Sequence, residues 1–357
     1  MSSSSDAEVL FQAEGAARII TLNRPKALNA LNLPMVRLIY PVLKKWQTEP
    51  NVGLVIIKGS GDKAFCAGGD VLSVTKSAKS DGEVHDNFFR EEYALNYLIG
   101  TFSHPYVALI DGITMGGGCG LSIHGSHRVA TEKTLLAMPE TALGLFPDVG
   151  GSYFLPRLPG KLGMFLALTG YRLKGADVYH AGLATHYVEA KHVSSLEEAL
   201  KRLPKEKCDK KTVSQVISEF QPSNIPEFSL KPYLNIINKT FDGKSVENII
   251  EKLEAEGSEF SKAQVSELSK MSPTSLKVTY QQLVTGGVTN FADVFKMEAR
   301  MTQHFLRGHD FYEGCRAILV DKDRNPKWKP SKLSEVSAEV VNSYFEAIPK
   351  SEDLILN

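Results

Sequence analysis

Two acidic residues stand in a segment that is otherwise apolar and bounded by proline and glycine. Glu140 and Asp148 lie within Met138–Gly151. Carboxylates are rarely buried in apolar surroundings unless they are paired with another group or have a functional role. Two carboxyl groups near one cavity can act as acid, base or nucleophile. Taken alone, the segment is equally compatible with a helix-start carboxylate followed by a turn aspartate.

Two glycine-rich segments supply a different kind of group, the backbone N–H. They are Phe65–Asp70 and Gly116–Gly120, and each follows an apolar stretch. Glycine lets the backbone turn tightly, and an N–H at the start of a helix has no intrahelical partner. Taken singly, the first could be a plain strand-to-helix turn capped by Asp70, and the second a close helix–strand contact. Together, two such loops can each give one N–H to a developing oxyanion, with the acidic segment completing an acyl-transfer site.

Other familiar sites fit this sequence poorly. The second glycine segment lacks the lysine of a phosphate loop, and Ile123 stands where a dinucleotide fingerprint needs glycine. No G-x-S-x-G nucleophile elbow is present. His124 and His127 form an HxxH on an expected helix, but no third ligand is near in sequence, so we expect packed histidines and no metal. Cys66 and Cys119 are expected to be small buried residues because no motif places a histidine base beside them.

The segments around these residues alternate between strand-like and helix-like patterns. Strands are expected at Ala17–Leu22, Gly53–Lys58, Tyr106–Ile110, Arg128–Ala130 and Leu135–Ala137, and helices from Asn32 to Trp46 and over Phe88–Tyr97. This order predicts parallel pairing and an α/β core. After Ser194 the sequence favours helices, at Leu196–Leu203, Val246–Glu256 and Asn290–Leu306.

Composition excludes several classes of protein. The 357 residues carry 41 Lys and Arg against 41 Asp and Glu, so the formal net charge is zero. This balance argues against binding nucleic acid through bulk charge. The apolar runs are too short for a membrane span, and four scattered cysteines fit a reducing compartment. Met1–Asp6 is expected to be neither a signal peptide nor an intact transit peptide.

Longer strings resemble the crotonase (enoyl-CoA hydratase/isomerase) superfamily. They include TLNRPKALNAL, KAFCAGGD, GGGCG and ATEKTLLAMPE, and they cover residues 8–190. Further strings, among them PETALGLFPDVGGSYFLPRL and GCRAILVDKDRNPKWKP, are similar to a hydrolase branch of that superfamily and run nearly to the C-terminus. The resemblance implies an α/β fold, with a crotonase-type ββα spiral core over 8–225 and a mainly helical C-terminal region over 226–357. Residues 1–7 are expected to be a disordered or vector-derived N-terminus.

The resemblance also implies which residues act. Gly69 and Gly117 match the two oxyanion-hole N–H donors that grip a thioester carbonyl. Glu140 matches a carboxylate shared by hydratases and hydrolases, and Asp148 matches the additional acid of the hydrolase branch. Glu92 matches a residue that helps to form the acyl pocket. Gly117, Glu140 and Asp148 are therefore expected both to bind substrate and to take part in catalysis.

Four more positions match the part of the family site that binds coenzyme A. Backbone groups of Ala27, Leu28 and Ala67 are expected to meet the CoA moiety together with Gly69, and Lys26 is expected to contact a phosphate. The resemblance implies an acyl-CoA as the small-molecule partner, with neither metal nor redox cofactor. It also implies no nucleic acid and no membrane, and it leaves homo-oligomerisation open. Family members of animal type suggest a mitochondrial location.

One departure from the family pattern bears on the reaction. Hydratases carry a glutamate two residues after the triple glycine, where this chain has Gly120. The resemblance therefore implies thioester hydrolysis, with 3-hydroxyisobutyryl-CoA and 3-hydroxypropionyl-CoA as substrates, in valine breakdown. Glu140 would either attack the carbonyl to form an anhydride or deprotonate a water molecule. The alternatives are hydratase or isomerase activity, and a non-catalytic acyl-CoA-binding protein.

Overall fold

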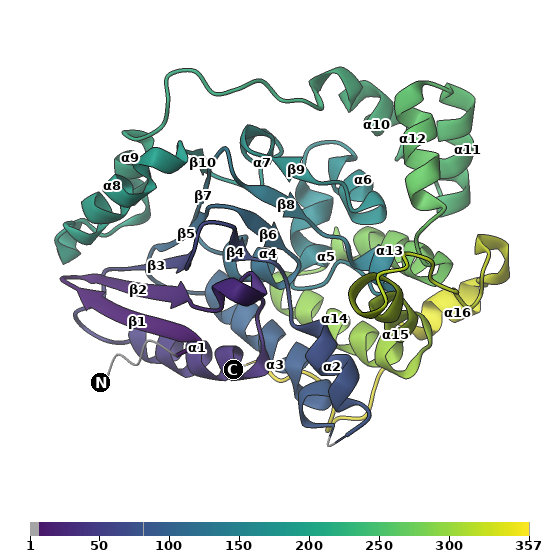
Figure 1. Cartoon of the computed structure of the whole chain (residues 1–357), viewed down its shortest axis with the longest axis horizontal. Coiled ribbons are helices and arrows are strands. Elements are labelled where there is room, and N and C mark those ends of the chain that lie inside the picture. The colour runs from purple at the N-terminus through teal and green to yellow at the C-terminus, as the bar shows by residue number, and fades with distance from the viewer. Residues whose placement is uncertain (1–6, 81, 357) are drawn as a thin grey trace. The chain divides into compact units, whose positions relative to one another are not determined.

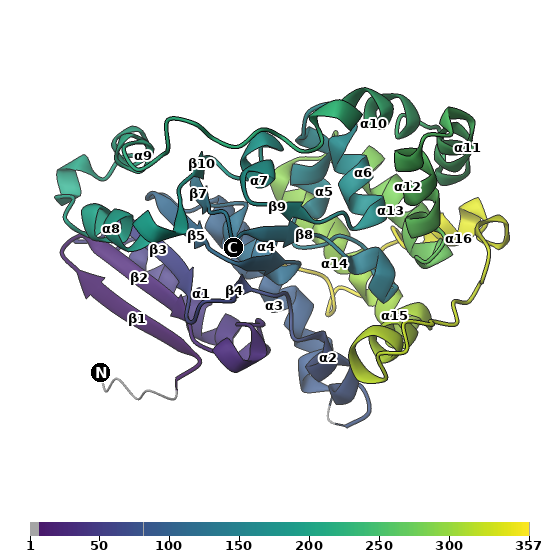
Figure 2. The same cartoon turned by 45° about the horizontal axis from the view of Figure 1, so that its top comes forward.

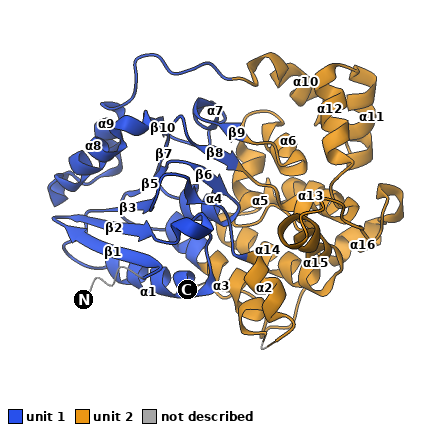
Figure 3. Cartoon of the chain, in the orientation of Figure 1, with its two compact units in different colours: residues 1–70, 95–136, 173–228 blue, residues 71–94, 137–172, 229–357 orange. Residues whose placement is uncertain are grey.

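The computed structural model describes residues 7–80 and 82–356. The expected N-terminal segment therefore lies outside the described residues, apart from Ala7. The chain forms two compact units, each assembled from separate stretches (Figure 3). Unit 1 contains 1–70, 95–136 and 173–228, and unit 2 contains 71–94, 137–172 and 229–357. The division into 8–225 and 226–357 stays a prediction.

A six-stranded sheet forms the centre of unit 1 (Figure 1). Its strands run in the order β1 (Val9–Glu14), β2 (Ala17–Leu22), β3 (Leu54–Gly59), β5 (Tyr106–Ile110), β7 (His127–Ala130) and β10 (His186–Tyr187). The pairs from β2 onward are parallel, which confirms the expected α/β core. β1 was not predicted, and it pairs antiparallel with β2 at the edge of the sheet.

Apolar side chains from the strands and from two later helices make the core of unit 1. Ile19, Ile56 and Val107 are fully buried with Leu196 of α8 (Ala190–Lys201) and Val213 of α9 (Lys210–Ser218). Figure 2 shows α8 and α9 beside this sheet. Continuous apolar strands are typical of parallel sheets that are covered on both faces.

A smaller sheet in unit 1 carries the glycine-rich segments. It contains β4 (Ala64–Cys66), β6 (Ile113–Met115), β8 (Leu135–Ala137) and β9 (Leu173–Lys174). The segment Phe65–Asp70, expected to be a loop, thus begins within a strand. α4 (Gly117–Ser122) follows β6 directly. The remaining helices of unit 1 are α1 (Leu33–Trp46), which Asn32 caps as expected, and α7 (Ala176–His180).

Unit 2 is mainly helical. Its helices are α2 (Val71–Ser77), α5 (Gly151–Phe154), α6 (Leu162–Thr169), α10 (Leu234–Thr240), α11 (Val246–Glu256), α12 (Glu259–Leu268), α13 (Pro273–Gly286), α14 (Phe291–Arg307), α15 (Asp310–Cys315) and α16 (Ala338–Ser343). It also includes 83–94 of α3 (Glu83–Gly100). The helices expected at Val246–Glu256 and after Asn290 are confirmed. Among the described residues, no helix is both long enough and apolar enough to cross a bilayer.

Candidate active site

The two glycine-rich segments lie against each other in unit 1. β4 and β6 pair in parallel, so the loops that follow them leave the sheet at the same edge. A Cβ atom at Gly118 would lie 2.2 Å from the carbonyl oxygen of Cys66, which means that only glycine fits there. The same packing buries Cys66 and Cys119, as expected.

Each glycine predicted to donate to an oxyanion has an N–H without an acceptor among the described residues. The hydrogen bonds around Gly69 belong to its neighbours, since Leu31 donates to the Gly68 carbonyl at 2.8 Å and Asp70 donates to the Leu31 carbonyl at 2.7 Å. No described residue accepts from the N–H of Gly69. Gly117 is the first residue of α4, where the N–H has no intrahelical partner. Both amides are therefore available to a ligand.

The positions predicted to bind CoA lie on two segments of unit 1, Lys26–Leu28 and the loop after β4 that carries Ala67 and Gly69. Lys26 and Leu28 line a cavity of about 260 Å³ together with Lys63. The N–H of Ala67 donates to the Leu28 carbonyl at 3.0 Å, which joins two of these positions directly. Lys26 and Ala27 are exposed at the surface. Their role as CoA contacts stays a prediction.

The three predicted acids belong to unit 2 and are buried there. Glu140 begins a 3₁₀ turn, Glu140–Leu143, and is 5% exposed, while Asp148 in the turn before α5 is 4% exposed. Glu92 on α3 is 1% exposed. Oε1 of Glu92 and Oε2 of Glu140 have no hydrogen-bond partner among the described residues. Buried oxygens of this kind carry a substantial desolvation cost, which favours a ligand or water as their partner.

Burial raises the pKa of each of these acids. Burial raises the pKa of the Asp148 carboxyl to about 7, against a hydrogen bond from Tyr93 that lowers it. The pKa of Glu140 is raised well above its usual range by burial and then by the charge of Asp148. The pKa of Glu92 is raised by burial and by the charges of Asp148, Glu140 and Glu298. The group therefore holds both protonated and ionised carboxyls near neutral pH.

A fourth acid, missed in the sequence, holds the turn that contains Asp148. Glu298 on α14 is fully buried and accepts hydrogen bonds from the N–H of Gly150 at 2.7 Å and of Ser152 at 2.9 Å. Burial raises its pKa to about 8. Its position on the buried face of α14, four residues after Val294, was the available signal, because a glutamate on an apolar stripe needs a partner.

Tyr93 is the second residue that the sequence did not reveal. Its hydroxyl donates to Oδ2 of Asp148 at 2.7 Å and lies 2.7 Å from Oγ1 of Thr302. Tyr93 and Thr302 are fully buried. Tyr93 lies next to Glu92 on α3, so both residues of that helix contribute to the surroundings of Asp148.

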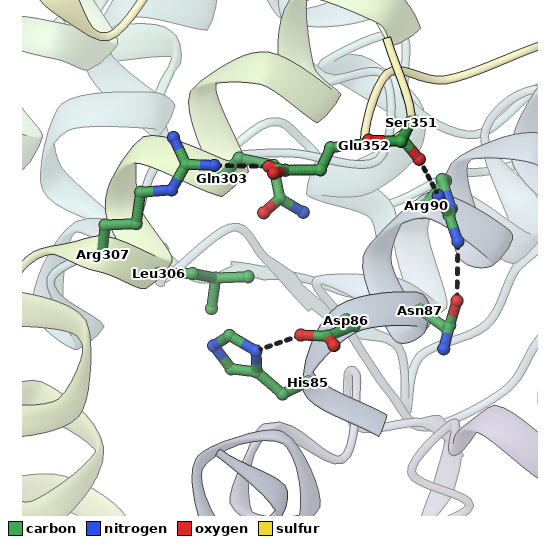
Figure 4. A pocket seen from close by; sticks show the side chains of 9 residues that line it. All are labelled: His85, Asp86, Asn87, Arg90, Gln303, Leu306, Arg307, Ser351 and Glu352. Carbon is green, nitrogen blue, oxygen red and sulfur yellow. Dashed lines mark hydrogen bonds and ion pairs between the residues drawn. The ribbon is translucent and has the colours of Figure 1, made fainter. Parts of the chain in front are cut away.

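Unit 2 has a cavity of about 480 Å³, which is lined by none of the four acids (Figure 4). Arg90 donates to the Ser351 carbonyl at 3.0 Å, and Arg307 is paired with Glu352. These arginines are already engaged by the C-terminal tail, so the cavity is an attachment point for that tail.

The histidine pair differs from expectation. His124 lies in a turn and His127 in β7, so the two do not share a helix. His127 stacks on His186 with ring centroids 6.0 Å apart. Among the described residues, no three His, Cys, Asp or Glu side chains gather as metal ligands would.

Comparison with known proteins places this chain in a family. Residues 17–345 match the enoyl-CoA hydratase/isomerase family. The chain belongs to this family. It is 54% identical to "3-hydroxyisobutyryl-CoA hydrolase, mitochondrial" of Xenopus tropicalis, over 97% of this chain and 91% of that protein. It is 52% identical to the protein of the same name from Homo sapiens, over 99% of this chain and 92% of that protein.

Solved structures confirm that this family member has the predicted fold. A carnitinyl-CoA dehydratase from Mycobacterium thermoresistibile matches with a TM-score of 0.90 at 36% identity, over 98% of this chain and 99% of that one. An enoyl-CoA hydratase from Rhodobacter sphaeroides matches with a TM-score of 0.87 at 34% identity, over 98% and 100% of the two chains.

Proposed function

We propose that this chain hydrolyses the thioester of 3-hydroxyisobutyryl-CoA to 3-hydroxyisobutyrate and free CoA. The observation that carries the proposal is the 52–54% identity, over nearly the whole chain, to relatives that bear this activity in their names. The shorter analogue 3-hydroxypropionyl-CoA is proposed as a second substrate. The names of the relatives support a mitochondrial location. A role in valine breakdown is proposed from the family resemblance alone.

The first step is polarisation of the thioester carbonyl. The proposal assigns this to the N–H groups of Gly69 and Gly117, and their lack of other acceptors supports it. Preorganised N–H donors of this kind are often the largest single contribution to acyl-transfer catalysis. Removing one typically costs about 10²–10³ in kcat.

The second step is addition of the nucleophile and loss of CoA. In its ionised form, Glu140 either attacks the carbonyl carbon or takes a proton from the water that attacks it, and its unpartnered Oε2 supports both versions. The C–S bond then breaks, and the thiolate takes a proton from Asp148, or Asp148 orients the 3-hydroxyl of the acyl group. The pKa of Asp148, raised to about 7 by burial, suits a group that gives and regains a proton near neutral pH.

One labelled-water experiment separates the two versions. A single turnover in ¹⁸O-water with excess enzyme leaves label in the Glu140 carboxyl only if an anhydride forms and water then attacks the glutamyl carbonyl. Attack of the water on the acyl carbonyl of the substrate places all label in the free acid. Peptide mass spectrometry of the segment around Glu140 reads the difference.

Binding of CoA is proposed for the loop of unit 1 that carries Lys26, Ala27 and Leu28, with Ala67 and Gly69 beside it. The cavity next to Lys26 and Lys63 supports this assignment because both lysines can face phosphate groups. The proposed chemistry needs neither metal nor redox cofactor, since the oxyanion donors and carboxyls account for each proton and bond.

Hydration of an enoyl-CoA is the second candidate. The names of the dehydratase and hydratase that share 34–36% identity favour it. Gly120 weighs against it, because that position lacks a carboxylate. A panel of short acyl-CoAs tests the proposal through release of free thiol. Rapid release from 3-hydroxyisobutyryl-CoA, with Glu140→Gln slower by about 10²–10⁴, is expected. No release above the uncatalysed rate would contradict it.

A further inference from the structure

The surroundings of Asp148 contain partners for both of its protonation states. We propose that Tyr93 and Thr302 are positioning residues that form a reversible hydrogen-bond relay behind Asp148. The relay holds the Asp148 carboxyl in one place whether it is protonated or ionised. Its role in turnover rests on the proposed function, whereas the relay itself can be tested without substrate.

The relay is a continuous line of buried oxygens. The Tyr93 hydroxyl lies 2.7 Å from Oδ2 of Asp148 and 2.7 Å from Oγ1 of Thr302. Oγ1 of Thr302 lies 2.9 Å from the carbonyl oxygen of Glu298, one turn earlier on α14. Tyr93 and Thr302 are fully buried and Asp148 is 4% exposed. The line therefore begins at a proposed catalytic acid and ends at a backbone acceptor.

Two proton arrangements satisfy this line without moving a heavy atom. A hydroxyl has one proton to donate and can also accept. When Asp148 is ionised, Tyr93 donates to it and Thr302 donates to Tyr93. When Asp148 is protonated, it donates to Tyr93, Tyr93 donates to Thr302, and Thr302 donates to the Glu298 carbonyl. Because a buried donor without an acceptor is costly, this second arrangement needs the Thr302 hydroxyl.

The charged groups around Asp148 explain why both states need support. Besides burial, the charge of Asp148 raises the pKa of Glu92 and Tyr93 on α3, of Glu140 in the 3₁₀ turn and of Glu298 on α14, so all four groups face it. Burial disfavours ionisation of Asp148, and the hydrogen bond from Tyr93 favours it. The backbone of the turn is fixed separately by the bonds from Gly150 and Ser152 to Glu298. The relay is thus the part of the site that can adapt to a proton.

Two conservative variants should move the pKa of Asp148 in opposite directions. Thr302→Val removes the acceptor that the protonated state needs, so the pKa falls. Tyr93→Phe removes the donor to the ionised state while burial persists, so the pKa rises. Each shift is expected to be about half to one pH unit, the size of one hydrogen bond. Thr302→Ser keeps the hydroxyl and should restore the parent value.

Infrared titration of the carboxyl groups measures the pKa of Asp148 without substrate. The signal of Asp148 is identified as the one that is missing in Asp148→Asn. The pH profile of CoA release then shows whether the same pKa governs turnover. Matched controls are Thr240→Val and Tyr106→Phe. In the parent chain, the Thr240 hydroxyl donates to the Ile236 carbonyl at 2.8 Å, and the Tyr106 hydroxyl donates to the Leu121 carbonyl at 3.0 Å. Both should leave the Asp148 signal unchanged.

The relay would be overturned if the pKa of Asp148 shifted in the same direction in Thr302→Val and Tyr93→Phe, or did not shift in either variant. If Tyr93→Phe does not fold, the pair Thr302→Val and Thr302→Ser decides alone, and equal pKa values in these two would overturn it. If the parent chain releases no CoA, the proposed function is wrong. The titration still tests the relay in that case, because it needs no substrate. If the parent releases CoA and the titration shows no opposite shifts, the relay fails and the proposed function stands.

Discussion

The N–H of Gly150 donates a 2.7 Å hydrogen bond to Oε2 of Glu298, a residue on a helix far away in the sequence. Between Asp148 and Gly150, Val149 has a φ of +52°. A β-branched residue rarely adopts this left-handed conformation, and such strain persists only where surrounding contacts impose it. The Glu298 carboxyl is such a contact, because it binds two N–H groups of this turn.

Glu298→Gln should therefore slow the reaction without abolishing folding. The substitution replaces one carboxyl oxygen by an NH₂ group, which faces a backbone N–H and cannot accept its hydrogen bond. The turn therefore shifts, and Asp148 moves with it. We expect kcat to fall about 10²-fold, as for misplacement of about 1 Å, with little change in KM. Steady-state kinetics check this. Glu197→Gln is the matched control, since Glu197 is 7% exposed and pairs with Lys58 in unit 1. An unaltered kcat in Glu298→Gln would refute the role given to this residue.

Gly118→Ala should damage the oxyanion donors directly. The new methyl group would lie 2.2 Å from the Cys66 carbonyl oxygen, so α4 and β4 must separate. We expect the free energy of unfolding to fall by about 3 kcal/mol and CoA release to be largely lost. Gly182→Ala is the control, because no atom lies within 4 Å of its Cβ and only its φ of +83° is strained. Equal losses in urea denaturation of the two variants would count against the close packing of these loops.

The raised pKa values of the acids make stability depend on pH. Asp148 and Glu298 have folded-state pKa values of about 7 and about 8, above their ordinary values of 3.8 and 4.5. Their contribution to stability is therefore fully present below pH ~4 and is lost as pH rises through 7 to 8. We expect Asp148→Asn to melt at a higher temperature than the parent at pH 8 and near the parent value at pH 4. The reverse order in calorimetry would mean that Asp148 is stabilised in its ionised form.

The acid cluster should also select among acyl groups. The charges acting on Glu92 come from Asp148, Glu140 and Glu298, all of them acids. An acyl chain that ends in a carboxylate would bring a further negative charge to these buried acids, so we expect kcat/KM for succinyl-CoA to be at least ~10²-fold below that for 3-hydroxyisobutyryl-CoA. Comparable values for the two thioesters, measured by thiol release, would show that the cluster does not face the acyl group.

Local patterns in the sequence predicted the parallel strands of unit 1 and the helix starts capped by Asn32 and Asn290. These features depend on neighbouring residues, so a single sequence reveals them. β1 escaped notice because most of its side chains are partly or fully exposed and give no apolar alternation. The helix expected for His124 and His127 was wrong because α4 ends at Ser122.

The sequence indicated which individual acids matter, but it did not indicate the contacts among them. Glu140 and Asp148 were visible because an apolar segment surrounds them in the sequence. Glu298 and Tyr93 contact the Asp148 turn from separate helices, and only the folded chain brings those elements together. The roles given to Gly69, Gly117 and the CoA loop came from resemblance, and they remain predictions until substrate is bound.

The central claim is that this chain hydrolyses a 3-hydroxyacyl thioester and does not hydrate an enoyl one. Its most direct test follows free thiol from 3-hydroxyisobutyryl-CoA and loss of the enoyl double bond from crotonyl-CoA, under the same conditions and with the same enzyme. The account predicts rapid thiol release from the first, slowed about 10²–10⁴-fold by Glu140→Gln, and little hydration of the second. Fast hydration of crotonyl-CoA without thiol release from 3-hydroxyisobutyryl-CoA would contradict it.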